Sequence, residues 1–192
     1  MLNLKKEIKD YCFLIKKSLK EPLINLINHE IYNNIDSFQS GAIGEGEVDT
    51  EIRSVKIMSL EPNEIGPFVS RRVIFNELKK YVAFIEDIYR TKVSNHYFSD
   101  KNYFQFLYYD HKMSGHYEYH TDHSFNNPRS LTILVGLNSI DDYEGGELFV
   151  ANEEGIKLDK GDVVCFPSNF MFPHKVSKIT KGHRKVLVIW TQ

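Results

Sequence analysis

The sequence predicts a mainly β fold of the α+β class, a jelly roll (double-stranded β-helix) in which N-terminal helices pack on one of two antiparallel sheets. Aromatic residues are numerous, with 13 Phe, 11 Tyr and 1 Trp in 192 residues, and many fall in alternating or β-branched segments that favour strands. Two amphipathic helix patterns occupy the first half, and short β-like runs follow residue 102. A sandwich with helices on one outer face is the simplest architecture for this order.

The first half alternates strand and helix signals. A short apolar run at 11–15 predicts a buried strand. A capping-box pattern followed by Leu and Ile at helical intervals predicts a helix over 19–33. Residues 37–50 are rich in Gly, Ser, Glu and Asp and predict a surface loop, and the alternation at 52–57 predicts a strand. A second amphipathic helix is expected over 70–92.

The second half predicts strands only. The expected strands are 103–109, 117–122, 130–137, 147–151, 156–158, 162–166, 174–179 and 184–191. The last of these strands has apolar residues at both odd and even positions, as in a central strand covered on both faces. We therefore expect one domain over 1–192, in which 1–101 is a supporting region and 102–192 is the jelly-roll catalytic core.

Composition excludes several classes of function. Lys and Arg number 24 against 26 Asp and Glu, so a net charge of −2 gives no field that would attract nucleic acid. The apolar runs are far shorter than the roughly 20 residues that cross a bilayer, and the first residues lack a signal-peptide pattern. Cys12 and Cys165 are too few for a disulfide framework. A cytoplasmic protein is expected, as a monomer or a homodimer.

The segment from His116 to Asp122 carries the chemical signal. On a helix, His116 and His120 would share a face, as in a zinc hydrolase. Gly115 and the neighbouring Tyr and Thr residues favour a strand instead, where the two imidazoles would lie about 13 Å apart. His120 and Asp122, two apart on a strand, would face one side and could share a cation. A His-x-Asp pair alone is more often a surface pair than a set of metal ligands. Whether this one forms a metal site therefore depends on further ligands.

Two later residues extend this pair. His174 begins a later strand and could complete the 2-His-1-carboxylate triad that leaves three positions open on Fe(II). Arg184 lies ten residues further and could bind the remote carboxylate of a dicarboxylate in bidentate fashion. A hairpin turn centred on Lys181-Gly182 would leave Arg184 on the order of 10–17 Å from His174 along the strands, a gap that a five-carbon diacid fits once side-chain reach is subtracted.

Four segments in this order resemble a known family. They are His120-x-Asp122, Tyr143-Glu-Gly-Gly-Glu-Leu148, Gly161-Asp-Val-Val-Cys-Phe-Pro167-Ser168, and His174-Lys-Val176 with Gly182-His-Arg184 through Trp190. Together they resemble the 2-oxoglutarate- and Fe(II)-dependent oxygenases, in the prolyl 4-hydroxylase-like branch, over residues 104–190. The glycines of the second segment are also explained by a simple turn.

The resemblance implies a set of roles. His120, Asp122 and His174 would be the iron ligands and Arg184 the partner of the C5 carboxylate of 2-oxoglutarate. Tyr109 would hydrogen-bond this co-substrate, with Tyr108 a rival for that role and core packing an alternative for both. Fe(2+), 2-oxoglutarate and O2 are implied, with L-ascorbate (vitamin C) keeping the iron ferrous. The implied reaction is an oxidative decarboxylation coupled to hydroxylation of a substrate C–H bond.

The substrate and even turnover stay open at this stage. A dioxygenase acting on a peptidyl-prolyl residue, a small-molecule hydroxylase for an amino acid or nucleoside, and a non-catalytic metal-binding jelly roll all fit the pattern. Residues 37–50 and 110–115 are expected to cover the site. The remaining histidines of the second half, His111, His116, His123 and His183, are expected in loops or on the surface.

Overall fold

The computed structural model describes residues 7–44, 46–61, 68–93, 96–151 and 154–192. Its described strands form two antiparallel sheets. The larger has eight strands in the order β1 (Phe13–Ile15), β10 (Val163–Pro167), β7 (Leu131–Gly136), β12 (Ile179–Thr191), β5 (Asn102–Asp110), β4 (Lys56–Ser59) and β2 (Gln39–Ser40), with β8 (Tyr143–Gly145) also paired to β12. The smaller has the order β3 (Arg53–Ser54), β6 (His116–His120), β11 (His174–Val176) and β9 (Leu148–Val150).

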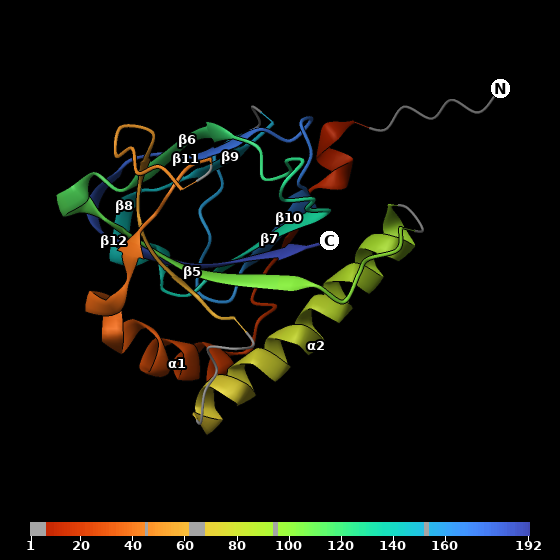
Figure 1. Ribbon diagram of the computed structural model, residues 1–192, viewed down its shortest axis with the longest axis horizontal. Helices are drawn as coiled ribbons and strands as arrows, with labels where there is room; N and C mark the ends of the chain where they lie inside the picture. Colours follow the sequence, from red (N-terminus) through yellow and green to blue (C-terminus); the bar gives the residue numbers. More distant parts are fainter. Residues whose placement is uncertain (1–6, 45, 62–67, 94–95, 152–153) are drawn as a thin grey trace.

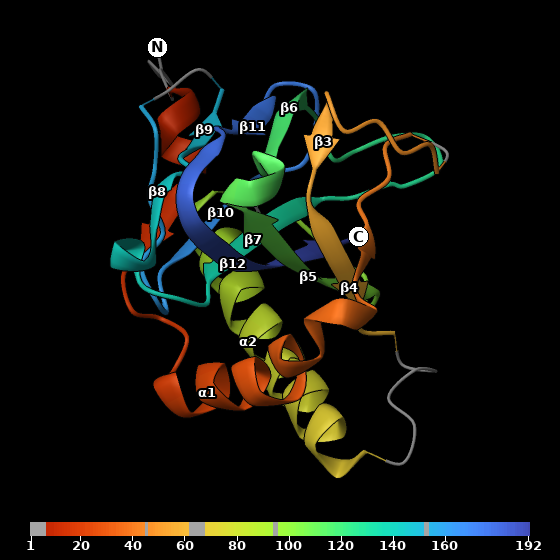
Figure 2. The same ribbon diagram turned by 90° about the vertical axis from the view of Figure 1, so that its left-hand side faces the viewer.

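Two helices cover the outer face of the larger sheet, on the side away from β6, β9 and β11 (Figures 1 and 2). They are α1 (Glu21–Glu30) and α2 (Val69–Lys92). Short 3-10 helices lie at η1 (Ile8–Tyr11), η2 (Tyr32–Ser37), η4 (His111–Met113) and η5 (Ile140–Asp142). Among the described helices, none combines the length and the apolar character needed to span a bilayer.

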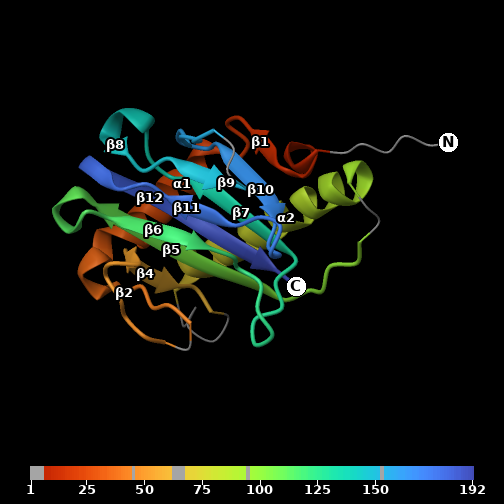
Figure 3. The ribbon, with the colours of Figure 1, turned by 90° about the horizontal axis from the view of Figure 1, so that it is seen from above.

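The larger sheet is buried on both faces, and β12 shows how. Leu187 and Ile189 join the apolar core formed with α1 and α2. Arg184, Val186 and Val188 have the opposite parity, and the two valines join the core that lies between the sheets. Because side chains alternate along a strand, this one segment supplies both cores. The mainly β prediction with few helices is therefore confirmed, and the view from above shows β6 and β11 side by side on the near face (Figure 3).

Several predicted elements are confirmed, with boundaries that shift by a few residues. Helix α2 begins one residue before its prediction, whereas α1 is shorter than the predicted 19–33. The predicted strand at 156–158 is wrong, because Ile156 forms only an isolated bridge with Leu148. The loop prediction for 37–50 missed β2.

The predicted hairpin turn at Lys181-Gly182 is also wrong. These residues lie inside β12, which is continuous from Ile179 and pairs there with β8, a strand that the sequence did not predict. Gly182 has φ +68°, and a Cβ there would collide with the backbone carbonyl of Asp142. The glycine thus marks a close approach of two segments of the chain, and not a turn that reverses the chain direction. His174 and Arg184 consequently lie in different sheets.

Candidate metal and co-substrate site

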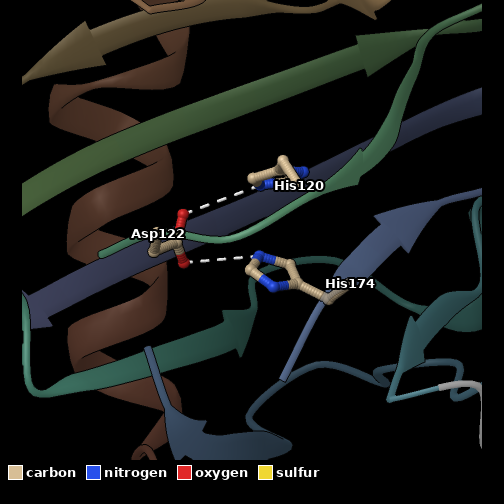
Figure 4. Close-up of side chains that lie close together, drawn as sticks. All are labelled: His120, Asp122 and His174. Carbon is tan, nitrogen blue, oxygen red and sulfur yellow. Dashed lines mark ion pairs between the residues drawn. The ribbon is translucent and has the colours of Figure 1, made fainter. Parts of the chain in front are cut away.

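Three side chains converge between the two sheets: His120 at the end of β6, Asp122 just after it, and His174 at the start of β11 (Figure 4). His120 Nε2 lies 3.6 Å from Asp122 Oδ1, and His174 Nε2 lies 3.3 Å from Asp122 Oδ2. One donor atom from each of the three lies within 4.8 Å of the other two. Direct pairing of His120 with His174 across β6 and β11 produces this convergence.

Each imidazole is oriented by its own backbone. His120 Nδ1 lies 2.8 Å from the carbonyl of Glu118, and His174 Nδ1 lies 3.1 Å from the carbonyl of Phe172. If Nδ1 donates a hydrogen to that carbonyl, Nε2 is left with a lone pair that faces the centre. Outer hydrogen bonds of this kind fix the tautomer of metal-binding histidines.

The electrostatics of the cluster favour a neutral imidazole at His120 and an ionised carboxylate at Asp122. Burial, together with the charge of His174, lowers the pKa of His120 to about 3, although Asp122 opposes this. Burial alone would raise the pKa of Asp122, but the charges of both histidines and hydrogen bonds from His174 and Thr132 bring it below its usual value. Two imidazole nitrogens and one carboxylate suit a divalent transition metal, and this donor set fits Fe(II).

A buried hydroxyl pair supports the carboxylate. Thr132 Oγ1 on β7 donates a 2.6 Å hydrogen bond to Asp122 Oδ2 and lies 2.9 Å from Ser168 Oγ. Both hydroxyl residues are fully buried. Sequence reasoning did not single out Thr132, because its position in an apolar strand gives no sign of a polar role.

Arg184 is buried without a counter-charge in contact. Its side chain is 1% exposed, and none of its three guanidinium nitrogens has a hydrogen-bond partner among the described residues. Leaving such a group unpaired is costly, so this geometry indicates an anionic ligand. Gly146 lies against it, since a Cβ there would be 3.1 Å from Arg184 Cδ. Gly146 thus makes room for the aliphatic part of the Arg184 side chain, whereas Gly145 accommodates the backbone of Lys178.

The two candidate tyrosines point in opposite directions. Tyr109 pairs with Arg184 across β5 and β12, is 1% exposed, and has its ring 5.4 Å from the guanidinium carbon. It lines the cavity that also contains the three convergent side chains. Tyr108 faces the other side, where it packs against the helix-side core and its hydroxyl donates to Asp110 at 3.4 Å. Geometry therefore places Tyr109, and not Tyr108, beside the site.

The cavity measures about 240 Å³ and has aromatic and cationic walls. The Tyr117 ring stacks on His120 at 3.5 Å between centroids, and Arg53 lies 4.6 Å from the Tyr117 centroid. Arg129 lies 3.7 Å from the Trp190 centroid. Sequence reasoning missed both arginines, because they lie outside the motifs.

Of the two segments that were predicted to cover the site, one lines the cavity and the other does not. Ala42 and Gly44 of the 37–50 segment line the cavity, whereas no residue of 110–115 does.

His116 is 4% exposed, which corrects the prediction of a surface residue. Its ring nitrogens each lie 2.8 Å from a carbonyl, those of Ser114 and Glu51, so it links β6 to the chain before β3.

Comparison with known proteins supports this class of site. Residues 104–192 match the family model of the 2OG-Fe(II) oxygenase superfamily. A PKHD-type hydroxylase of Psychrobacter sp. (strain PRwf-1) is 43% identical over 65 residues, which are 32% of this chain and 24% of that protein. A PKHD-type hydroxylase of Idiomarina loihiensis is 33% identical over 82 residues, 40% of this chain and 37% of that protein. The chain thus spans well under half the length of these relatives.

Solved structures share the fold at low sequence identity. A Trichoplax adhaerens prolyl hydroxylase, in complex with a peptide fragment of the hypoxia inducible factor oxygen degradation domain, superposes with a TM-score of 0.76 and 18% identity, covering 95% of this chain and 83% of that one. A Pseudomonas putida prolyl-4-hydroxylase gives a TM-score of 0.76 and 17% identity, covering 95% and 92%.

The fold brings three potential metal-binding side chains together between its two sheets. Residues 104–192 match the family model of the 2OG-Fe(II) oxygenase superfamily, and the chain is similar to PKHD-type hydroxylases. The resemblance predicted from the sequence is confirmed.

Proposed function

We propose that this chain is an Fe(II)- and 2-oxoglutarate-dependent hydroxylase. The observation that carries the proposal is the convergence of His120, Asp122 and His174 between the sheets, together with the buried and unpaired guanidinium of Arg184. With iron bound, the centre supplies the balanced reaction in which 2-oxoglutarate, O2 and R–H give succinate, CO2 and R–OH.

The chain's own groups hold and orient the reactants. His120 Nε2, His174 Nε2 and the Asp122 carboxylate would hold the ferrous ion. Arg184 would donate charge-assisted hydrogen bonds to the far carboxylate of 2-oxoglutarate, with Tyr109 beside that carboxylate. L-ascorbate would restore the ferrous state after unproductive cycles.

The two sheets support a double-stranded β-helix of the jelly-roll type. We infer one domain, with residues 102–192 as the catalytic core and 1–101 as its support. In favour, α1 and α2 share an apolar core with β5, β7, β10 and β12. We propose a cytoplasmic location, in line with a sequence that contains only two cysteines, and a monomer or a homodimer.

A prolyl residue of a polypeptide is the substrate we propose. The structural relatives include a prolyl-4-hydroxylase and a prolyl hydroxylase bound to a peptide fragment. In this chain, the Arg53 and Arg129 guanidinium groups and the Tyr117 and Trp190 rings line the cavity. Such groups suit a peptide, because guanidinium donates to backbone carbonyls and aromatic faces contact the proline ring.

The decisive experiment has two stages. Anaerobic addition of Fe(II) and 2-oxoglutarate should produce a weak visible charge-transfer band, since the keto acid chelates the iron. Admission of O2 with proline-containing peptides should then release succinate and add one oxygen to the peptide. Turnover only with amino acids or nucleosides would assign the small-molecule alternative. A metal-loaded protein that releases no succinate with either panel would be a non-catalytic binding module.

A further inference from the structure

A second cavity adjoins the metal cavity at Arg129. It measures about 630 Å³, compared with about 240 Å³ for the cavity that holds His120, Asp122 and His174. Arg129 lines both. Its guanidinium lies 3.8 Å from Asp122 Oδ1, so this side chain contacts the convergent cluster and also borders the second cavity.

The wall between them is the segment that follows β6. Asp122, Ser124 and Asn127 face the metal cavity, whereas His123 and Ser130 face the second one. Backbone hydrogen bonds hold this segment in place. The His123 N–H donates to the Ser168 carbonyl, and the Ser168 N–H donates to the Ser130 carbonyl, both at 3.0 Å. The rim between the cavities is therefore a built part of the fold.

The second cavity is suited to an apolar group. Its wall is formed largely by Tyr11, Phe98, Leu131, Pro167, Met171 and Phe172, and it contains no Asp or Glu among the described lining residues. Tyr11 and Phe172 meet edge to face, with centroids 6.3 Å apart. A concave, mainly apolar space with few polar groups is typical of a binding site.

We propose that this cavity is a docking subsite for an apolar side chain of a polypeptide substrate, a few residues away from the residue that is hydroxylated. The inference rests on the proposed hydroxylase function and specifies its substrate class. An extended chain advances about 3.3 Å per residue, so a short segment crosses the Arg129 wall. A free amino acid at the metal would leave the larger cavity empty, and a lining without carboxylates gives no counter-charge for a basic side chain.

The test measures binding without turnover. Displayed peptides of about 12 residues with one fixed central proline, long enough to span both cavities when extended, are selected on the Zn(II)- and 2-oxoglutarate-loaded protein. Selected peptides should share an apolar residue at a fixed distance from the proline. Met171→Asp should raise their dissociation constant at least about tenfold, or ~1.4 kcal/mol.

Phe170→Asp is the matched control. Phe170 and Met171 are neighbours that are 82% and 51% exposed, but only Met171 lines the cavity. Equal effects of the two substitutions would overturn the docking subsite, as would selected peptides without a shared apolar position or a failure to select any peptide. Succinate release is measured separately on the Fe(II)-loaded protein. Its absence, with peptide binding intact, would contradict the hydroxylase function and leave the subsite standing.

Discussion

Thr132 Oγ1 donates its 2.6 Å hydrogen bond to Asp122 Oδ2, the same carboxylate oxygen that faces His174 Nε2 at 3.3 Å. Because Thr132 belongs to β7, the central sheet itself orients the carboxylate. Burial of this pair excludes water that could take over the hydrogen bond.

Thr132→Val should therefore weaken metal binding with little change in shape. Loss of an outer hydrogen bond to a ligand typically costs 10- to 100-fold in metal affinity, so we expect the Fe(II) or Mn(II) dissociation constant to rise by roughly this factor. Thr132→Ser keeps the hydroxyl and should stay close to wild type. An affinity for Thr132→Val equal to that of Thr132→Ser would show that the hydrogen bond does not support the ligand.

His174→Ala should abolish tight binding of Fe(II) while the protein stays folded. The substitution removes one of three donors, and two donors cannot hold the ion in a fixed geometry. Metal titration and circular dichroism measure the two effects. His29→Ala is the control, because the His29 side chain is 73% exposed on α1. Retained tight metal binding in His174→Ala would place the metal elsewhere.

Arg184→Met should separate stability from co-substrate binding. Removal of a buried and unpaired charge should leave the ligand-free protein at least as stable as wild type in urea. Binding of 2-oxoglutarate should weaken at least about thirtyfold, ~2 kcal/mol, because a charge-assisted pair is lost. Calorimetry with the metal-loaded protein measures this. Unchanged affinity would mean that another cation holds the far carboxylate.

Cys165 should be inert to thiol reagents near neutral pH. Burial raises the pKa of its thiol to about 12, so the reactive thiolate is scarce until the pH approaches that value. Cys12→Ser leaves Cys165 as the single thiol and should react only after denaturation. Cys165→Ala leaves Cys12, which is half-buried, and should react while folded. Rapid labelling of native Cys12→Ser would contradict this burial.

Local patterns predicted most of the framework. The alternation of β12 and the apolar stripe of α2 indicated elements that the structure contains, because burial on a defined face dictates both patterns. The strand assignment of His120 also led to the pair with Asp122 and then to His174. The chemical types of these residues constrained the site more strongly than their spacing.

The errors lie where a close contact between distant segments decides the structure. The sequence indicated a turn at Gly182. The reason for this glycine is its close approach to the Asp142 backbone, which depends on the pairing of β8 with β12. Tyr108 and Tyr109 could not be separated before the pairing of β5 with β12 set which one shares a face with Arg184. His116 obtains one partner, the Glu51 carbonyl, from 65 residues away, and Thr132 contacts Ser168 from 36 residues away.

The pairing of β6 with β11 has a mechanical consequence. An ion bound by His120 and His174 would staple two neighbouring strands of the smaller sheet and close the long stretch of chain between them, much as a disulfide does. The larger sheet is stabilised separately, by the apolar core that it shares with α1 and α2. Removal of the ion by a chelator would accordingly loosen the smaller sheet first, and the larger sheet, which packs on the helices, would remain folded.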